Sequence, residues 1–126
     1  MNRKITTYGN YFNEFYSKLE KEVQEKVDWV FQMVKAVDQI PKKFFQHIET
    51  TEGIYEIRVE FESNIYRIFC FFDEGHLVVL INSFQKKSQK TPTREIELSK
   101  KLKKQYFIDK KLKAEIEKGK KPKSKN

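Results

Sequence analysis

The chain has 126 residues, a net charge of +8 and one cysteine. This length favours a single domain that can bury a core without disulfides or metals. Because Cys70 and the two histidines are far apart in the sequence, no metal-ligand spacing is present, and we expect no cofactor. No apolar run reaches the ~20 residues of a membrane span, and the N-terminus lacks the apolar stretch of a signal peptide. We therefore expect a cytoplasmic protein.

The charge is unevenly distributed along the chain. Residues 1–85 carry 10 basic and 13 acidic residues, whereas residues 86–126 carry 16 basic and 5 acidic residues. Such an asymmetry favours a nucleic acid partner, or an acidic protein that neutralises the basic part. Solubility alone is the alternative explanation.

The first third of the chain predicts one strand and two helices. Residues 3–8 form a short β-prone run that ends at a glycine. Apolar residues then recur three and four positions apart over residues 11–37, which is a helical spacing. A turn at residues 19–22 would make this segment a helical hairpin, and one longer helix is the alternative. Pro41 ends the helical pattern.

The middle of the chain predicts three strands. A short apolar connector at residues 44–48 precedes strand-like runs at residues 54–61, 65–72 and 76–84. The first run alternates, and four of its residues form the expected core face: Tyr55, Ile57, Val59 and Phe61. The second run is almost entirely apolar, as expected of a central strand. The short turns between the runs predict an antiparallel meander.

The last part of the chain predicts a helix. Thr91 suits the N-cap and Pro92 the first helical position, so the helix should run from about Thr93 to Tyr106 or beyond. Residues 118–126 are rich in lysine and predict a disordered basic tail, which leaves residues 1–117 as the domain. The element order β-α-α-β-β-β-α indicates the α+β class. We expect a small twisted antiparallel sheet with an N-terminal helical hairpin and a C-terminal helix.

Cations gather where the last predicted strand gives way to the last helix. Lys86, Lys87 and Lys90 follow the strand and precede the helix N-terminus. Free N–H groups at a helix N-terminus and lysine ammonium groups together favour an anion. Arg58 and Arg67 lie on the two preceding strands. The sequence therefore predicts one basic patch on a small sheet, with RNA as the favoured polyanionic partner.

Three segments together resemble the RelE/ParE toxin superfamily, and within it the HigB-like, phage-related branch. They are GIYEIRV (residues 53–59), IYRIFCFF (65–72) and SFQKKSQKTP (83–92). The resemblance covers residues 44–106, and the N-terminal helices match in pattern only. It implies the toxin of a type II toxin–antitoxin pair, usually an endoribonuclease that cuts messenger RNA in the ribosomal A site. The usual partner is an antitoxin encoded alongside, often with a helix-turn-helix domain.

The resemblance also implies a chemistry and the residues that perform it. The ribose 2′-OH attacks the adjacent phosphate without a metal, and fixed cations stabilise the charge that develops there. Arg58, Arg67 and Lys87 correspond to active-site cations of the family, and arginine can bind two phosphate oxygens at once. The general acid and base stay unassigned. Three further cations are expected to bind RNA: Lys86, Lys90 and Arg94.

These assignments have alternatives at the level of the residue and of the function. Arg58 could instead form a cross-strand ion pair with Glu56 or Glu60. The lysines after the last strand could bind ribosomal RNA outside an active site. The whole protein could be a ParE-like toxin that binds DNA gyrase, or a protein that binds RNA or the ribosome without catalysis.

The chain departs from the family at one position of interest. Some members carry a tyrosine one turn into the last helix, where this chain has Thr93. His47 and Glu49 precede the first strand of the meander and could supply an acid or a base. A surface position beside a turn is the simpler interpretation of both, and His76 is expected to be structural.

Overall fold

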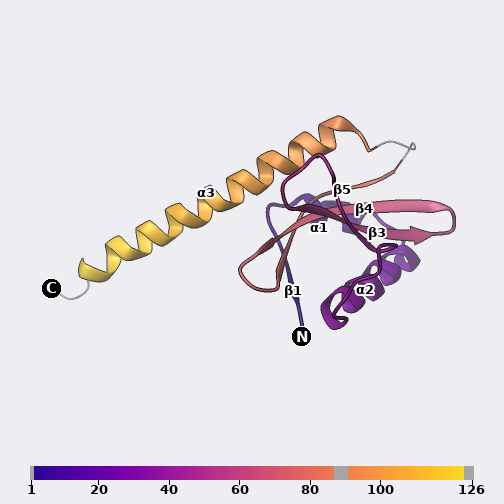
Figure 1. Cartoon of the computed structure of the whole chain (residues 1–126), viewed down its shortest axis with the longest axis horizontal. Helices are drawn as coiled ribbons and strands as arrows, with labels where there is room; N and C mark the ends of the chain where they lie inside the picture. The colour runs from indigo at the N-terminus through magenta and orange to yellow at the C-terminus, as the bar shows by residue number, and fades with distance from the viewer. Residues whose placement is uncertain (1, 87–90, 124–126) are drawn as a thin grey trace.

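The computed structural model describes residues 2–86 and 91–123, which fold into a five-stranded sheet and three helices (Figure 1). The strands are β1 (Lys4–Thr7), β2 (Phe45–His47), β3 (Ile54–Phe61), β4 (Asn64–Asp73) and β5 (Leu77–Gln85). The helices are α1 (Tyr11–Ser17), α2 (Lys21–Ala36) and α3 (Thr93–Lys123). This arrangement confirms the predicted α+β class, including the helical hairpin and the C-terminal helix.

The strands lie in the order β1-β5-β4-β3-β2. β2 to β5 pair in antiparallel fashion, which confirms the meander. Two details of the prediction are wrong. Residues Phe45–His47 form an edge strand instead of a connector, and β1 pairs in parallel with β5, so the sheet is mixed. β5, the partner of β1, lies about 70 residues further along the chain, after α1 and α2. The two strands are not joined by a short turn, so no turn motif indicates whether they pair in parallel or antiparallel fashion.

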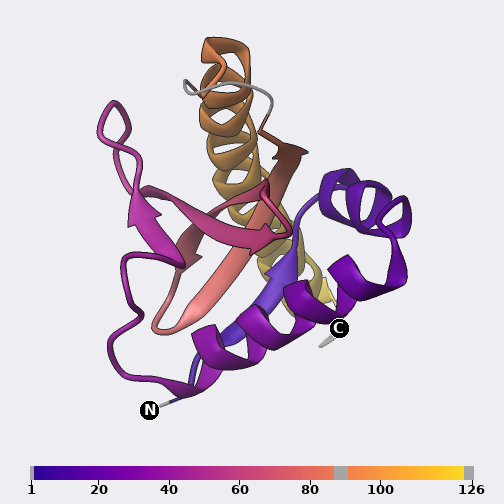
Figure 2. The same ribbon diagram turned by 90° about the vertical axis from the view of Figure 1, so that its right-hand side faces the viewer.

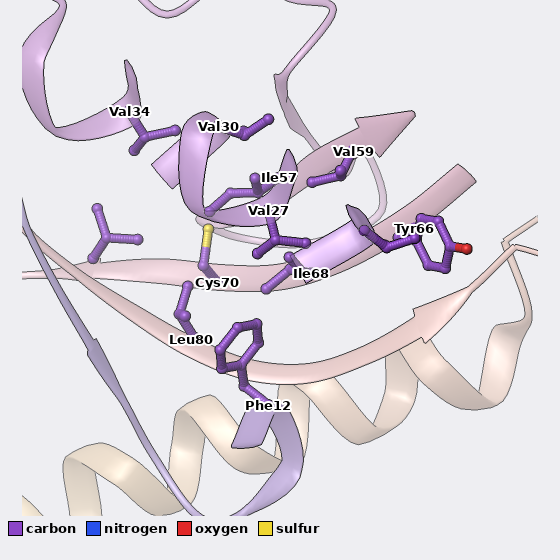
Figure 3. Packing of buried hydrophobic residues seen from close by; sticks show 12 residues of the cluster. Phe12, Val27, Val30, Val34, Ile57, Val59, Tyr66, Ile68, Cys70 and Leu80 are labelled. Carbon is purple, nitrogen blue, oxygen red and sulfur yellow. The ribbon is translucent and has the colours of Figure 1, made fainter. Parts of the chain in front are cut away.

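The helical hairpin covers one face of the sheet. α2 contributes four buried valines at helical spacing: Val23, Val27, Val30 and Val34. They pack against inward-facing residues of β3 and β4, including Ile57, Ile68 and Cys70 (Figure 3). Burial raises the pKa of the Cys70 thiol, so this side chain acts as a small core residue and not as a nucleophile.

The other face of the sheet is covered by the first half of α3, so α2 and α3 lie on opposite sides (Figure 2). Leu102 and Tyr106 of α3 pack against a second group of buried residues that includes Phe69 and Phe71 of β4. Because both faces are covered, β4 must be apolar along most of its length. The expectation of a central strand is therefore confirmed.

Polar contacts fasten α3 to the turn between β4 and β5. The Tyr106 hydroxyl donates to Asp73 Oδ2 at 2.6 Å, and Lys110 Nζ lies 2.9 Å from Asp73 Oδ1. Burial acts to raise the pKa of Asp73, but the hydrogen bonds from Tyr106 and Lys110 outweigh it, and the pKa is lowered. Burial and the bond to Asp73 raise the pKa of Tyr106 to about 12.

α3 continues to Lys123, and its second half extends beyond the sheet (Figure 1). The prediction of a disordered tail from residue 118 is therefore wrong for residues 118–123, which are helical. Residues 124–126 lie outside the described part of the chain. Runs of lysine and glutamate are good helix formers, so a charged composition does not by itself end a helix. Within the described residues, no helix combines the length and the apolar character that crossing a membrane requires.

Candidate nucleic-acid interface

Two arginines lie side by side on the central strands of the sheet. Arg58 on β3 and Arg67 on β4 are direct cross-strand partners, so both side chains leave the sheet on the same face. It is the face that α3 covers, because Phe69 and Phe71 follow Arg67 at alternate positions of β4 and pack against α3. Lys86 comes directly after β5, and its backbone N–H donates to the carbonyl of Ile65 at 2.8 Å. This bond holds the lysine at the end of the sheet that bears the arginines.

Arg67 is buried, with 7% of its surface exposed. Its Nη1 lies 3.1 Å from Glu56 Oε1 and also donates to the Thr91 hydroxyl. Burial lowers the pKa of Arg67, and the Glu56 carboxylate opposes that shift. Because Arg67 has two partners and little exposure, it is better suited to holding Glu56 and Thr91 in place than to binding a phosphate. We call this role an internal support.

Glu56 is the carboxylate at the centre of this group. It is 6% exposed, and its Oε2 is buried without a hydrogen-bond partner among the described residues. Burial raises the pKa of Glu56, although Arg67, Arg58 and Lys86 all act to lower it. A buried carboxyl group with a raised pKa beside several cations is typical of a functional site, although structural ion pairs show the same feature.

Arg58 and Lys86 are the cations of the group that reach solvent. The Arg58 side chain is 25% exposed, and its Nε lies 3.5 Å from Glu60 Oε2. An Arg58–Glu60 ion pair is therefore present in the structure, but it is a long contact between residues two apart on β3 and not the cross-strand pair of the alternative. Lys86 is half-buried, and its pKa is lowered by burial and by the charges of Arg67 and Arg58. A lowered lysine pKa is the direction expected when an ammonium group is partly buried near two other cations.

A buried asparagine holds the start of α3 above this group. Asn82 lies where the β4–β5 register is irregular, and its Nδ2 donates to both the carbonyl and Oε1 of Glu95, each at 3.0 Å. The helix begins at Thr93 as expected, but the Pro92 carbonyl accepts the N–H of Ile96, so Pro92 takes the N-cap position predicted for Thr91. The hydroxyl of Thr91 instead accepts a hydrogen bond from Arg67.

The structure brings together Arg58, Arg67 and Lys86, which the sequence singled out. Lys87 and Lys90 lie outside the described residues. Arg94 is exposed on the first turn of α3. His47 and Glu49 are also exposed, and the His47 ring contacts the ring of Tyr55 at 5.3 Å.

Sequence reasoning missed the roles of Glu56 and Thr91. Glu56 is two residues before Arg58 and therefore shares its face of β3, a signal that the alternation already carried. Thr91 carried no such signal, because its contact with Arg67 depends on how the chain returns to the sheet. Among residues 2–86 and 91–123, no three His, Cys, Asp or Glu side chains are grouped as metal ligands.

Comparison with known protein families gives a match. Residues 14–104 match the model of the family described as Phage derived protein Gp49-like (DUF891). The matched range begins in α1 and ends within α3, so it includes Glu56, Arg58, Arg67 and Lys86. No curated protein matches the chain.

Proposed function

Because the chain belongs to the phage-derived Gp49-like family, a RelE/toxin-like family, we propose that it is the toxin of a type II toxin–antitoxin pair. We place it in the HigB-like branch and propose that it cleaves messenger RNA on the ribosome. Its partners would be the messenger RNA, ribosomal RNA and a cognate antitoxin. The observation that carries the proposal is the convergence of Arg58, Arg67 and Lys86 around Glu56 at one end of the sheet.

The proposed reaction is an internal transfer at one phosphate. The ribose 2′-oxygen forms a bond to phosphorus, the bond to the 5′-oxygen breaks, and the products are a cyclic phosphate and a 5′-hydroxyl. A base must take the 2′-proton, and an acid must protonate the leaving oxygen. Arg58 and Lys86 are the solvent-accessible cations that would stabilise the additional phosphate charge.

Glu56 is our candidate for the base, because its raised pKa brings a carboxylate closer to the neutral range in which proton transfer is efficient. Arg67 would then be a positioning residue that holds Glu56 through the 3.1 Å contact. This assignment replaces direct phosphate binding by Arg67, because Arg67 Nη1 is already bound to Glu56 and Thr91, whereas Glu56 Oε2 has no hydrogen-bond partner among the described residues. Lys87 keeps its expected place among the active-site cations, beside Lys86 in the sequence.

The burial of Glu56 and Arg67 also favours a second candidate function. A toxin with the same surface could bind RNA through its accessible cations and block translation without cutting. Basic surfaces provide affinity by releasing counterions, without any chemical step. The two functions predict different products from the same mixture of ribosomes and message.

The deciding experiment maps message ends in a purified translation system, with translation active and blocked. Cleavage should require translation and leave 5′-hydroxyl ends. Arg58→Ala and Lys86→Ala should each slow cleavage by about 10²–10³-fold, the typical effect of removing one donor to a developing anion. Glu56→Gln should slow cleavage and flatten its dependence on pH.

Lys4→Ala is the matched control, because Lys4 is an exposed cation on β1, at the opposite edge of the sheet from β2. It should cleave like the unmodified protein. Intact message together with salt-sensitive ribosome binding would establish the second candidate and refute the nuclease. A toxin that damages DNA and leaves translation unaffected would point to the gyrase-binding alternative.

A further inference from the structure

The single tryptophan of the chain lies on the surface. Trp29 is on α2, one position before the buried Val30, and 54% of it is exposed. A large aromatic side chain at this exposure contributes little to the core, so the packing of the fold does not require it. Exposed aromatic side chains beside cations are the common feature of surfaces that bind single-stranded nucleic acid.

Trp29 is part of a group of rings and lysines drawn from two segments. The Phe44 ring lies 5.8 Å from the Trp29 ring, at 65° to it. Lys26 Nζ lies 5.0 Å from the centroid of Trp29, and Lys43 Nζ lies 5.7 Å from the centroid of Phe44. We name these four residues the aromatic–lysine surface.

The aromatic–lysine surface is continuous with the proposed active site through Arg58. Lys26, Lys43 and Phe44 line one small hollow of about 40 Å³ together with Arg58 and Glu60. The backbone N–H of Arg58 donates to the carbonyl of Phe44 at 2.8 Å, which fixes the surface against β3. Arg58 therefore belongs to both groups and lies between them, on β3.

The charge of the aromatic–lysine surface indicates which kind of partner it can bind. The hollow and its rings carry three cations, Lys26, Lys43 and Arg58, against the one carboxylate of Glu60. Such a surface suits a chain of phosphates with flat groups attached, because lysines neutralise phosphates while bases stack on aromatic rings. An apolar protein partner would bury these cations unpaired, at a high free-energy cost.

We propose that Trp29, Phe44, Lys26 and Lys43 form a stacking subsite for the bases of single-stranded RNA next to the phosphate held by Arg58. This proposal rests on the proposed RNA-directed function and adds to it the path of the RNA strand across the protein surface. Nucleotides on one side of the reacting phosphate pass over the edge of the sheet onto α2. The subsite selects unpaired bases without reading their identity, because every base offers a flat face.

The tryptophan itself provides the measurement, since Trp29 is the one tryptophan and its fluorescence reports this subsite alone. A 12-nucleotide single-stranded RNA should quench the fluorescence to a saturating level. The same strand with abasic residues should bind less tightly and quench little. Trp29→Ala should weaken RNA binding, measured by anisotropy, by about 5- to 100-fold, and Trp29→Phe should recover part of that loss.

Two further variants separate stacking from charge and from exposure. Lys26→Ala together with Lys43→Ala should reduce the slope of log affinity against log salt by about 0.7 for each phosphate that the protein no longer neutralises. Leu112→Ala is the matched control, because Leu112 is also 54% exposed but lies on α3. It should bind RNA as the unmodified protein does.

The outcomes distinguish this inference from the proposed function. RNA binding that persists in Trp29→Ala with unchanged affinity, or binding without quenching, overturns the subsite and leaves the RNA-directed function standing. Equal quenching by the abasic strand also overturns it, because charge alone would then suffice. Failure of the unmodified protein to bind the strand also overturns the subsite, whereas the proposed function is decided separately by whether message is cut on translating ribosomes. A melting temperature for Trp29→Ala within a few degrees of the unmodified protein shows that the comparison is valid.

Discussion

At the scale of single residues, the decisive feature is that a charged pair is buried beneath the accessible cations. Glu56 and Arg67 lie on neighbouring strands, and their side chains are 8% and 9% exposed. Removing both charges from water costs free energy that the 3.1 Å contact only partly offsets. The pair therefore contributes little net stability, but either residue alone would leave an uncompensated buried charge.

This burial makes Arg67 a poor choice for a simple test of activity. Arg67→Ala should lower the free energy of unfolding by about 3–5 kcal/mol, measured by chemical denaturation, because it leaves Glu56 buried without its main partner. Loss of activity in that variant would not separate catalysis from folding. Arg58 and Lys86, which reach solvent, avoid this difficulty.

A double-mutant cycle isolates the pair. Arg67→Met combined with Glu56→Leu should recover most of the stability that Arg67→Met alone removes, because no charge stays buried. Additive effects of the two single variants, or a cost of less than about 1 kcal/mol for Arg67→Met, would contradict the assignment of Arg67 as an internal support.

At the scale of elements, α3 is held to the sheet by its first half. Leu102 and Tyr106 pack on β4, and the Tyr106 hydroxyl donates to Asp73, whose side chain is 6% exposed. A hydrogen bond to a buried carboxylate contributes about 1.5–3 kcal/mol. The position of α3 above the cations thus depends on a contact at the far end of β4 from Arg67.

The raised pKa of Tyr106 predicts how stability changes in alkali. A group whose pKa rises on folding, here to about 12, contributes fully below its ordinary pKa of about 10. That contribution is lost as the pH rises through the folded-state value. The free energy of unfolding should therefore fall more steeply between about pH 10 and pH 12 in the unmodified protein than in Tyr106→Phe.

The lysines contribute to the pH dependence of stability in both the unmodified protein and Tyr106→Phe, so comparing these two proteins cancels their contribution. Tyr11→Phe removes an exposed hydroxyl and should keep the steep alkaline slope of the unmodified protein. Equal slopes in the unmodified protein and Tyr106→Phe would show that the bond to Asp73 does not hold α3 in solution.

The elements themselves were predicted with uneven success, for a physical reason. Strands β3 to β5 follow one another through short turns, and their alternation and apolar content identified them. β2 has three residues, and its role depends on pairing with β3, which no local pattern records. The end of α3 was placed too early because lysine content suggested disorder, whereas lysine is compatible with a helix.

At the scale of the whole molecule, α3 extends past the sheet with apolar residues in solvent. Ile108, Leu112 and Ile116 are exposed and four residues apart, so they lie along one side of the helix. α3 carries 12 basic and 5 acidic residues, which disfavours pairing with a second copy and favours an acidic partner helix. Under the proposed function, that partner is the antitoxin.

This assignment predicts that antitoxin binding and RNA cleavage can be separated. Leu112→Glu or Ile116→Glu should weaken binding of the antitoxin encoded beside the toxin by about tenfold or more, measured by calorimetry, because a carboxylate would replace an apolar contact. Cleavage should not change. Gln32→Glu, which adds the same charge at an exposed position of α2, is the control. Unchanged affinity in both α3 variants would exclude this part of α3 as the binding surface.

The sequence by itself determined the α+β class, the three central strands, the N-terminal helical hairpin and the C-terminal helix. These properties follow from periodicity and turn chemistry, which act over a few residues. It also determined that Arg58, Arg67 and Lys86 belong to one basic region, because antiparallel neighbours bring alternate residues to one face.

Only the tertiary structure decided what each of those residues can do. Whether a cation is accessible depends on what the chain places over it, and the start of α3 and Thr91 cover Arg67 while Arg58 and Lys86 reach solvent. The parallel pairing of β1, the central place of Glu56 and the exposure of Trp29 likewise arise from contacts between distant segments. Free energies of burial and of ion pairing depend on those contacts, and a linear pattern does not contain them.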